Sequence, residues 1–133
     1  AGFEPKLEKE VSQANCPGTS AVLWANFDSG AVLGASSLGE RGKPAERVGE
    51  EAAKILVKAI GSGAAVDAHL CDQLLAFVAL AEGGSEFLAE AWSSHSETNA
   101  WLIRQFIKKE FEAKEESGKA VRVRCAGIGF KRD

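Results

Sequence analysis

Methionine is absent from the sequence, and cysteine and histidine are scarce. Among 133 residues there are no Met, three Cys and two His. The cysteines, Cys16, Cys71 and Cys125, are odd in number and form no Cys-x-x-Cys pair, which argues against a zinc site and a disulfide framework. We expect free thiols in a reducing compartment. Because translation starts with methionine, its absence indicates either that the initiator was removed or that the sequence is an internal piece of a longer protein. The start AGFEPKLEKE favours the second interpretation.

Long apolar runs are also lacking. No stretch reaches the roughly 20 residues of a membrane span, and residues 1–10 have no apolar signal-peptide core. We therefore expect a cytoplasmic protein without a membrane partner. The net charge of −3 argues against a surface devoted to nucleic acid but leaves room for a local basic site. Hydrophobic residues make up 45% of the chain, enough for the core of one domain.

The sequence that is present alternates between strand and helix patterns. A loose alternation suggests a strand at 5–13. Two apolar runs, 21–27 and 30–36, flank a short Asp/Gly loop and predict a β-hairpin. Apolar residues recur at helical spacing in three segments, 44–60, 67–81 and 98–114. Two further strands are expected, at 86–92 and 119–127.

The order ββ-αα-β-α-β predicts an α/β fold of the layered α+β kind. In such a fold a mixed sheet carries its helices on one face. Val121, Val123 and Cys125 alternate with Arg122 and Arg124, the clearest pattern of a half-buried strand in the chain.

A basic loop precedes the first expected helix. In GERGKPAERVG, residues 39–49, Arg41 and Lys43 lie beside glycines before a helix N-terminus, where free N–H groups and the helix dipole favour anions. The loop can hold a phosphate, although it matches neither a P-loop nor a dinucleotide fingerprint. The same residues suit a solvated connector with ordinary surface charge. Both interpretations stay open on these residues alone.

A polar triplet follows in AHLCDQLL, residues 68–75. His69, Asp72 and Gln73 stand at i, i+3 and i+4, so they project from one side of the second helix. An imidazole, a carboxylate and an amide can read the hydrogen-bonding edge of a base or ribose. The alternative is the polar side of an amphipathic helix. No metal site is expected, because too few ligand types stand together.

His95 lies in WSSHSETNAW, residues 92–101, between an expected strand and an expected helix. An imidazole on such a connector can act as general acid, general base or nucleophile near neutral pH. Ser96 and Thr98 are candidates for capping the helix, so a purely structural junction explains the hydroxyls equally well. No Gly-x-Ser-x-Gly occurs, which argues against a serine hydrolase of the nucleophile-elbow kind.

The order and spacing of these segments resemble one family. LGERGKPAERVGEEAA at 38–53, VDAHLCDQLL at 66–75 and SSHSETN at 93–99 are similar to the C-terminal part of RNA 3′-terminal phosphate cyclases. CPGTSAVLWANFDSGAVLGASSLGERG, at 16–42, resembles the return from that family's inserted small domain. The resemblance covers most of residues 15–110. It implies that residues 1–40 end the inserted domain and that 41–133 form the last repeat of the main domain.

The resemblance implies an ATP-dependent enzyme of the ligase class. It converts an RNA 3′-phosphate into a 2′,3′-cyclic phosphodiester through a covalent histidyl-AMP, with a divalent metal, Mg or Mn, offsetting the triphosphate charge. The match assigns the nucleophile to His95. It places three residues in the nucleotide pocket, His69, Asp72 and Gln73. Further candidates for contact with phosphate or RNA are Arg41, Lys43 and Arg104.

Family members are more than twice as long as this chain. Their N-terminal half adds a glutamate, an arginine and a glutamine to the active site, so the chain by itself is expected to be inactive without that half. One branch of the family lacks the nucleophilic histidine and serves in ribosome assembly. The alternative function is therefore a non-catalytic RNA-binding or ribosome-assembly module of the same fold. A third interpretation is an α/β domain whose motif match is accidental.

Overall fold

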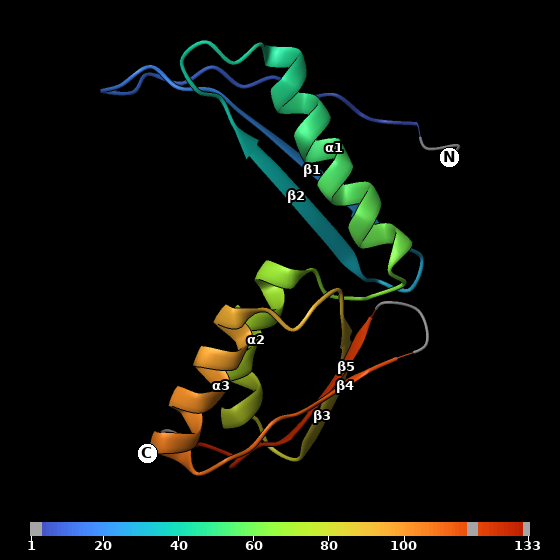
Figure 1. Ribbon diagram of the computed structural model, residues 1–133, viewed down its shortest axis with the longest axis vertical. Helices are drawn as coiled ribbons and strands as arrows, with labels where there is room; N and C mark the ends of the chain where they lie inside the picture. The colour runs from blue at the N-terminus through green and yellow to red at the C-terminus, as the bar shows by residue number, and fades with distance from the viewer. Residues whose placement is uncertain (1–3, 117–119, 132–133) are drawn as a thin grey trace.

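The computed structural model describes residues 4–116 and 120–131, and they form two units placed end to end (Figure 1). The first unit contains β1 (Ser20–Asn26), β2 (Val32–Leu38) and α1 (Ala45–Gly61). The second contains α2 (Ala68–Leu80), β3 (Gly84–Ala89), α3 (Ser94–Ile107), β4 (Glu112–Glu115) and β5 (Val121–Ala126).

In the first unit, one helix covers one face of an antiparallel hairpin. β1 and β2 pair from Ser20–Leu38 to Asn26–Val32. Leu33, 1% exposed, packs with Leu56 and Ala59 of α1. The opposite face of the hairpin carries exposed apolar side chains, namely Val22, Trp24, Val32 and Leu38.

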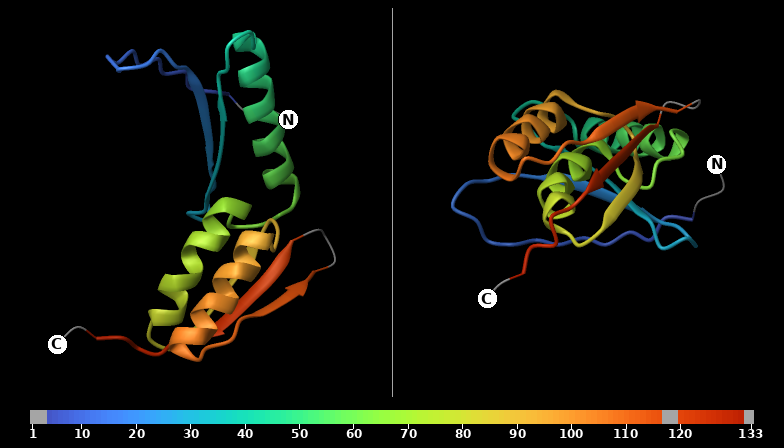
Figure 2. Two further views of the ribbon diagram at one scale, coloured as in Figure 1. Left: turned by 60° about the vertical axis from the view of Figure 1, so that its left-hand side comes forward. Right: turned by 90° about the horizontal axis from the view of Figure 1, so that it is seen from below.

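In the second unit, α2 and α3 lie on one face of a three-stranded sheet (Figure 2). The strand order is β3-β5-β4, and both pairings are antiparallel. The predicted alternation in β5 is confirmed, because Val121, Val123 and Cys125 are buried while Arg124 is exposed. The core of the unit lies between the helices and the sheet. Its buried residues are Val66, Cys71, Leu75, Ala89, Val121 and Val123.

The two units are connected by the segment between α1 and α2 and by an ion pair. Val66 forms an isolated parallel bridge with Ala89 at the end of β3. Lys58 Nζ, in the last turn of α1, lies 3.0 Å from Glu90 Oε1. The side chain of Glu90 is only 8% exposed, so this pair ties α1 to the segment that leads from β3 towards His95.

The expected fold class and element order are confirmed. The helices predicted at 44–60 and 67–81 agree with α1 and α2 to within a residue at each end. The strands, however, are divided between two antiparallel sheets, and the one parallel contact among the described elements is the Val66–Ala89 bridge. β4 is an additional strand, which pairs with β5. The expected division into residues 1–40 and 41–133 stays a prediction.

Two element predictions were wrong. No strand forms at 5–13, where Leu7 and Val11 are 92% and 84% exposed because nothing packs against them. The third helix covers 94–107 instead of 98–114. It begins earlier because Ser93 caps it, and it ends where Lys108 takes a left-handed conformation at φ 60°.

Candidate active site

The first turn of α2 is set by Asp67. Its Oδ1 accepts hydrogen bonds from the backbone N–H groups of His69 at 3.0 Å and Leu70 at 2.8 Å. An N-cap aspartate satisfies donors that the helix itself leaves free. His69 is thereby held in the first turn with an exposed side chain.

The first turn of α3 is set by Ser93, whose Oγ accepts from Ser96 N–H at 3.1 Å. The prediction that Ser96 and Thr98 cap this helix was wrong. Ser96 is fully buried, and Thr98 Oγ1 donates to the Ser94 carbonyl at 2.8 Å inside the helix. His95 is the second residue of α3 and is exposed.

α2 and α3 run parallel, with their N-terminal turns side by side (Figures 1 and 2). Asn99 Nδ2 of α3 donates to the Asp72 carbonyl of α2 at 3.2 Å. Ser96 Oγ lies 3.8 Å from Cys71 Sγ. The N-termini of α2 and α3 therefore lie at the same end of the helical layer. Asp67 and Ser93 satisfy several of the first N–H groups, but the positive dipole ends of both helices still favour a phosphate-bearing ligand there.

The polar triplet of α2 lies near this end. His69 and Gln73, one helical turn apart, are both exposed, whereas Asp72 is half-buried beside α3. The structure thus brings four predicted site residues to the first two turns of two adjacent helices: His69, Asp72, Gln73 and His95.

The basic loop lies elsewhere. Lys43 Nζ is ion-paired with Glu51 and reaches the Leu38 carbonyl at 3.2 Å, so it ties the loop to β2 and α1. The hydrogen bond from Lys43 also holds the pKa of Glu51 below its ordinary value of 4.5. The 17-residue α1, about 25 Å long, separates this loop from the second unit (Figure 1). Arg41 and Lys43 are therefore not brought to His95.

Arg104 is also distant from the shared N-terminal end. It lies in the last turn of α3 and is paired with Glu110 at 3.5 Å. Both side chains are mostly exposed, at 61% and 75%.

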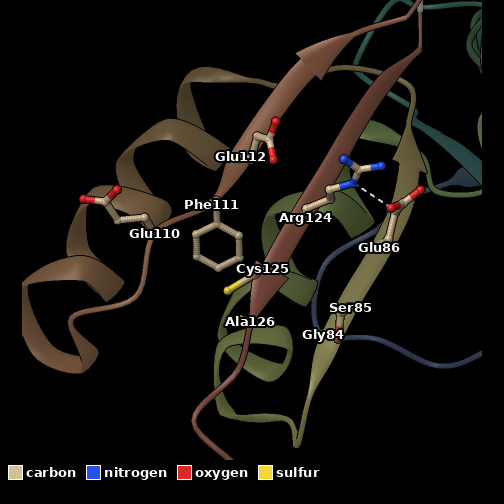
Figure 3. Close-up of a pocket in the computed structure, with 9 residues that line it drawn as sticks. All are labelled: Gly84, Ser85, Glu86, Glu110, Phe111, Glu112, Arg124, Cys125 and Ala126. Carbon is tan, nitrogen blue, oxygen red and sulfur yellow. Dashed lines mark hydrogen bonds and ion pairs between the residues drawn. The ribbon is translucent and has the colours of Figure 1, made fainter.

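A charged surface on the outer face of the three-stranded sheet was not predicted from the sequence. Arg124 Nε lies 2.6 Å from Glu86 Oε2, and Arg122 pairs with both Glu86 and Glu116. Figure 3 shows the Arg124–Glu86 pair at one side of a hollow that Phe111 and Cys125 also line. The Arg-x-Arg alternation of β5 was the available signal, but the shared partner Glu86 lies 36 residues from Arg122 and 38 from Arg124 in the sequence.

These ion pairs lower the pKa values of two carboxyl groups. Arg124, followed by Arg122, holds the pKa of Glu86 below 4.5, and Arg122 does the same for Glu116. A carboxyl whose folded-state pKa is lowered stabilises the fold above its unfolded pKa. That stabilisation is lost as the pH falls through the lowered value.

We expect Arg122→Gln to make the stability of the fold less dependent on pH in the acid range. Between about pH 6 and about pH 3 the urea midpoint of the unmodified chain should fall, and that of the variant should fall less. Urea unfolding followed by circular dichroism at both pH values measures this. Arg104→Gln is the matched control, because its exposed pair lies outside the network. If the urea midpoint of Arg122→Gln falls as much over this pH range as that of the unmodified chain, the ion pairs of Arg122 do not control stability in acid.

Over residues 4–116 and 120–131, no three His, Cys, Asp or Glu side chains are grouped so as to hold a metal ion. No helix in this part of the chain is both long and apolar enough to cross a membrane.

Comparison with known proteins identifies relatives. Residues 3–61 match the insert domain of RNA 3′-terminal phosphate cyclase (RTC). The chain is 41% identical to the RNA 3′-terminal phosphate cyclase of Pyrobaculum aerophilum, over 87% of this chain and 33% of the relative. It is 45% identical to the RNA 3′-terminal phosphate cyclase of Methanopyrus kandleri, over 95% of this chain and 38% of the relative. It is 47% identical to that of Thermococcus onnurineus, over 91% of this chain and 35% of the relative. The chain spans about one third of the length of these curated relatives.

Proposed function

We propose that this chain, which is related to the RNA 3′-terminal phosphate cyclases, carries the nucleophilic histidine of such an enzyme. The observation that supports this most strongly is the position of His95. It is exposed in the first turn of α3, directly beside the first turn of α2. The imidazole is thereby placed at the end of the layer where the dipoles of two helices favour an anion.

The first step we propose is adenylylation of His95. A ring nitrogen of the neutral imidazole attacks the α-phosphorus of ATP. A P–N bond forms, the bond to the β-phosphate oxygen breaks, and pyrophosphate leaves with its electron pair while the imidazole loses its N–H proton. A neutral imidazole is a competent nucleophile and a good leaving group from a phosphoramidate.

The second step transfers AMP to RNA, and the third closes the ring. An oxygen of the RNA 3′-phosphate attacks the phosphorus of histidyl-AMP, and the P–N bond breaks to return the imidazole. The neighbouring 2′-hydroxyl then attacks the 3′-phosphorus and loses its proton. AMP leaves, and the product is a 2′,3′-cyclic phosphodiester.

The residues around His95 suit the binding of ATP. The N-terminal dipole ends of α2 and α3 lie at the same end of the helical layer as the exposed side chains of His69 and Gln73. A divalent ion, Mg or Mn, would be held mainly by triphosphate oxygens, since the described residues offer no cluster of protein ligands. Its chemistry would be neutralisation of phosphate charge. Asp72, half-buried, would orient the nucleotide from α2.

The remaining two thirds of such an enzyme would be the principal protein partner. The relatives are about three times as long as the matched segment, so we expect the chain alone to convert no RNA. RNA with a 3′-phosphate end is the proposed substrate. Arg41, Lys43 and Arg104 lie away from His95, so any contact they make would be with more distant RNA phosphates.

The function is tested on a protein that joins this chain to the rest of a cyclase. RNA with a 3′-phosphate is incubated with ATP and Mg²⁺ or Mn²⁺, and the RNA end is then challenged with phosphatase. We expect an end resistant to phosphatase, with AMP and pyrophosphate released. RNA that binds but keeps a phosphatase-sensitive end would contradict the enzymatic function and favour the non-catalytic RNA-binding module.

A further inference from the structure

α3 is joined to α2 by two polar contacts immediately after His95. Asn99 is four residues beyond His95, so the two side chains share one side of α3. Its Nδ2 donates to the Asp72 carbonyl across the helix interface at 3.2 Å. Asn99 is half-buried, so this hydrogen bond is partly protected from water.

The second contact passes through Ser96, which is fully buried. Ser96 Oγ lies 3.2 Å from Ser93 Oγ and 3.8 Å from Cys71 Sγ. Ser93 is also the N-cap of α3. The cap of α3 is therefore linked through Ser96 to the interior of α2.

These contacts fix the register of the two helices. In parallel helices, residues one turn before a contact pair lie at nearly the same height. The Asn99–Asp72 contact therefore sets His95 level with Ala68 and His69. No hydrogen bond to the His95 ring is found in the described part of the chain. The position of the ring thus depends on where α3 places its backbone.

We propose that Asn99 is a positioning residue, which sets the height and direction of His95 against α2 through its hydrogen bond to the Asp72 carbonyl. The proposal rests on the proposed function of His95. Its chemical reason is geometric: a nucleophile displaced by about 1 Å from its line of attack can lose about a hundredfold in rate. Without this bond α3 keeps its core contacts but can slide against α2.

The test is Asn99→Asp in the joined protein, with Asn99→Ala beside it. Aspartate keeps the shape of asparagine but has no N–H to donate, and its charge repels the Asp72 carbonyl. Single-turnover labelling by α-³²P-ATP is measured across ATP concentrations. We expect the maximal rate to fall roughly tenfold to a hundredfold, with little change in the ATP concentration giving half that rate.

Gln105→Ala is the matched control. Gln105 Nε2 donates within α3, to the Trp101 carbonyl at 3.4 Å, and makes no bond to α2. We expect its labelling rate to be unchanged. A normal maximal rate in both Asn99 variants, or a loss that comes only from weaker ATP binding, would overturn the positioning role.

A second measurement separates this inference from the proposed function. NMR of the 133-residue chain, with labelled histidine, observes just two imidazole rings. We expect cross-relaxation between the His95 ring and the first turn of α2, and a shifted His95 signal in Asn99→Asp but not in Gln105→Ala. Failure of the unmodified protein to label would refute the function only. Absence of the His95–α2 contact in the unmodified chain would refute the positioning even where the variants do not fold.

Discussion

Replacement of His95 by alanine is expected to abolish covalent labelling of the joined protein by α-³²P-ATP. The imidazole of His95 forms the new bond to the α-phosphorus in the proposed first step, whereas His69, also placed at this end, is proposed to contact the nucleotide without attacking it. Loss of a nucleophile typically costs at least about a thousandfold in rate. The label is quantified after denaturing electrophoresis, and RNA cyclisation is followed in parallel.

Two control variants, His69→Ala and Gln105→Ala, test whether the loss of label is specific to His95. His69 is proposed to touch the nucleotide, so its variant should need more ATP but still become labelled. Gln105→Ala should label like the unmodified protein. A His95→Ala protein that keeps its label, while folded as judged by circular dichroism, would remove His95 from the chemistry.

Leu75→Ala is expected to destabilise the second unit by about 2–5 kcal/mol. Leu75 is fully buried and packs in the core with Cys71 and Val123. The substitution removes apolar surface from the core and leaves a cavity that rigid neighbours fill only in part. Urea unfolding at pH 7, followed by circular dichroism, measures the change in the free energy of unfolding.

Phe77→Ala on the same helix is the matched control. Phe77 is 71% exposed, so its loss should change the free energy of unfolding by no more than about 0.5 kcal/mol. Equal costs for the two substitutions would show that Leu75 is not in the core of the unit.

The elements that could be predicted are those with a clear internal period. The alternation of Val121, Val123 and Cys125 with two arginines predicted β5, and the hairpin followed from two apolar runs around a short loop. β4 could not be predicted, since its Glu-Ala-Lys-Glu sequence is exposed and becomes a strand only by pairing with β5. The start of α3 was misplaced because three serines stand near it, and only the fold shows that Ser93 is the cap.

The candidate site was predictable in composition but not in arrangement. Helical spacing grouped His69, Asp72 and Gln73, and the family resemblance added His95. Which helix lies beside which is a tertiary property, so the contacts made by Ser96 and Asn99 were invisible in the sequence. The same limit applies to the basic loop, whose separation from His95 follows from the direction of α1.

The most direct test of the account is to locate the adenylyl group by mass spectrometry. The joined protein is incubated with ATP and Mg²⁺ without RNA, digested under alkaline conditions that preserve a phosphoramidate, and sequenced peptide by peptide. The account predicts AMP on the imidazole of His95, in the peptide that contains WSSHSETNAW. AMP on any other residue, or no adenylylated peptide from a protein that cyclises RNA, would contradict it.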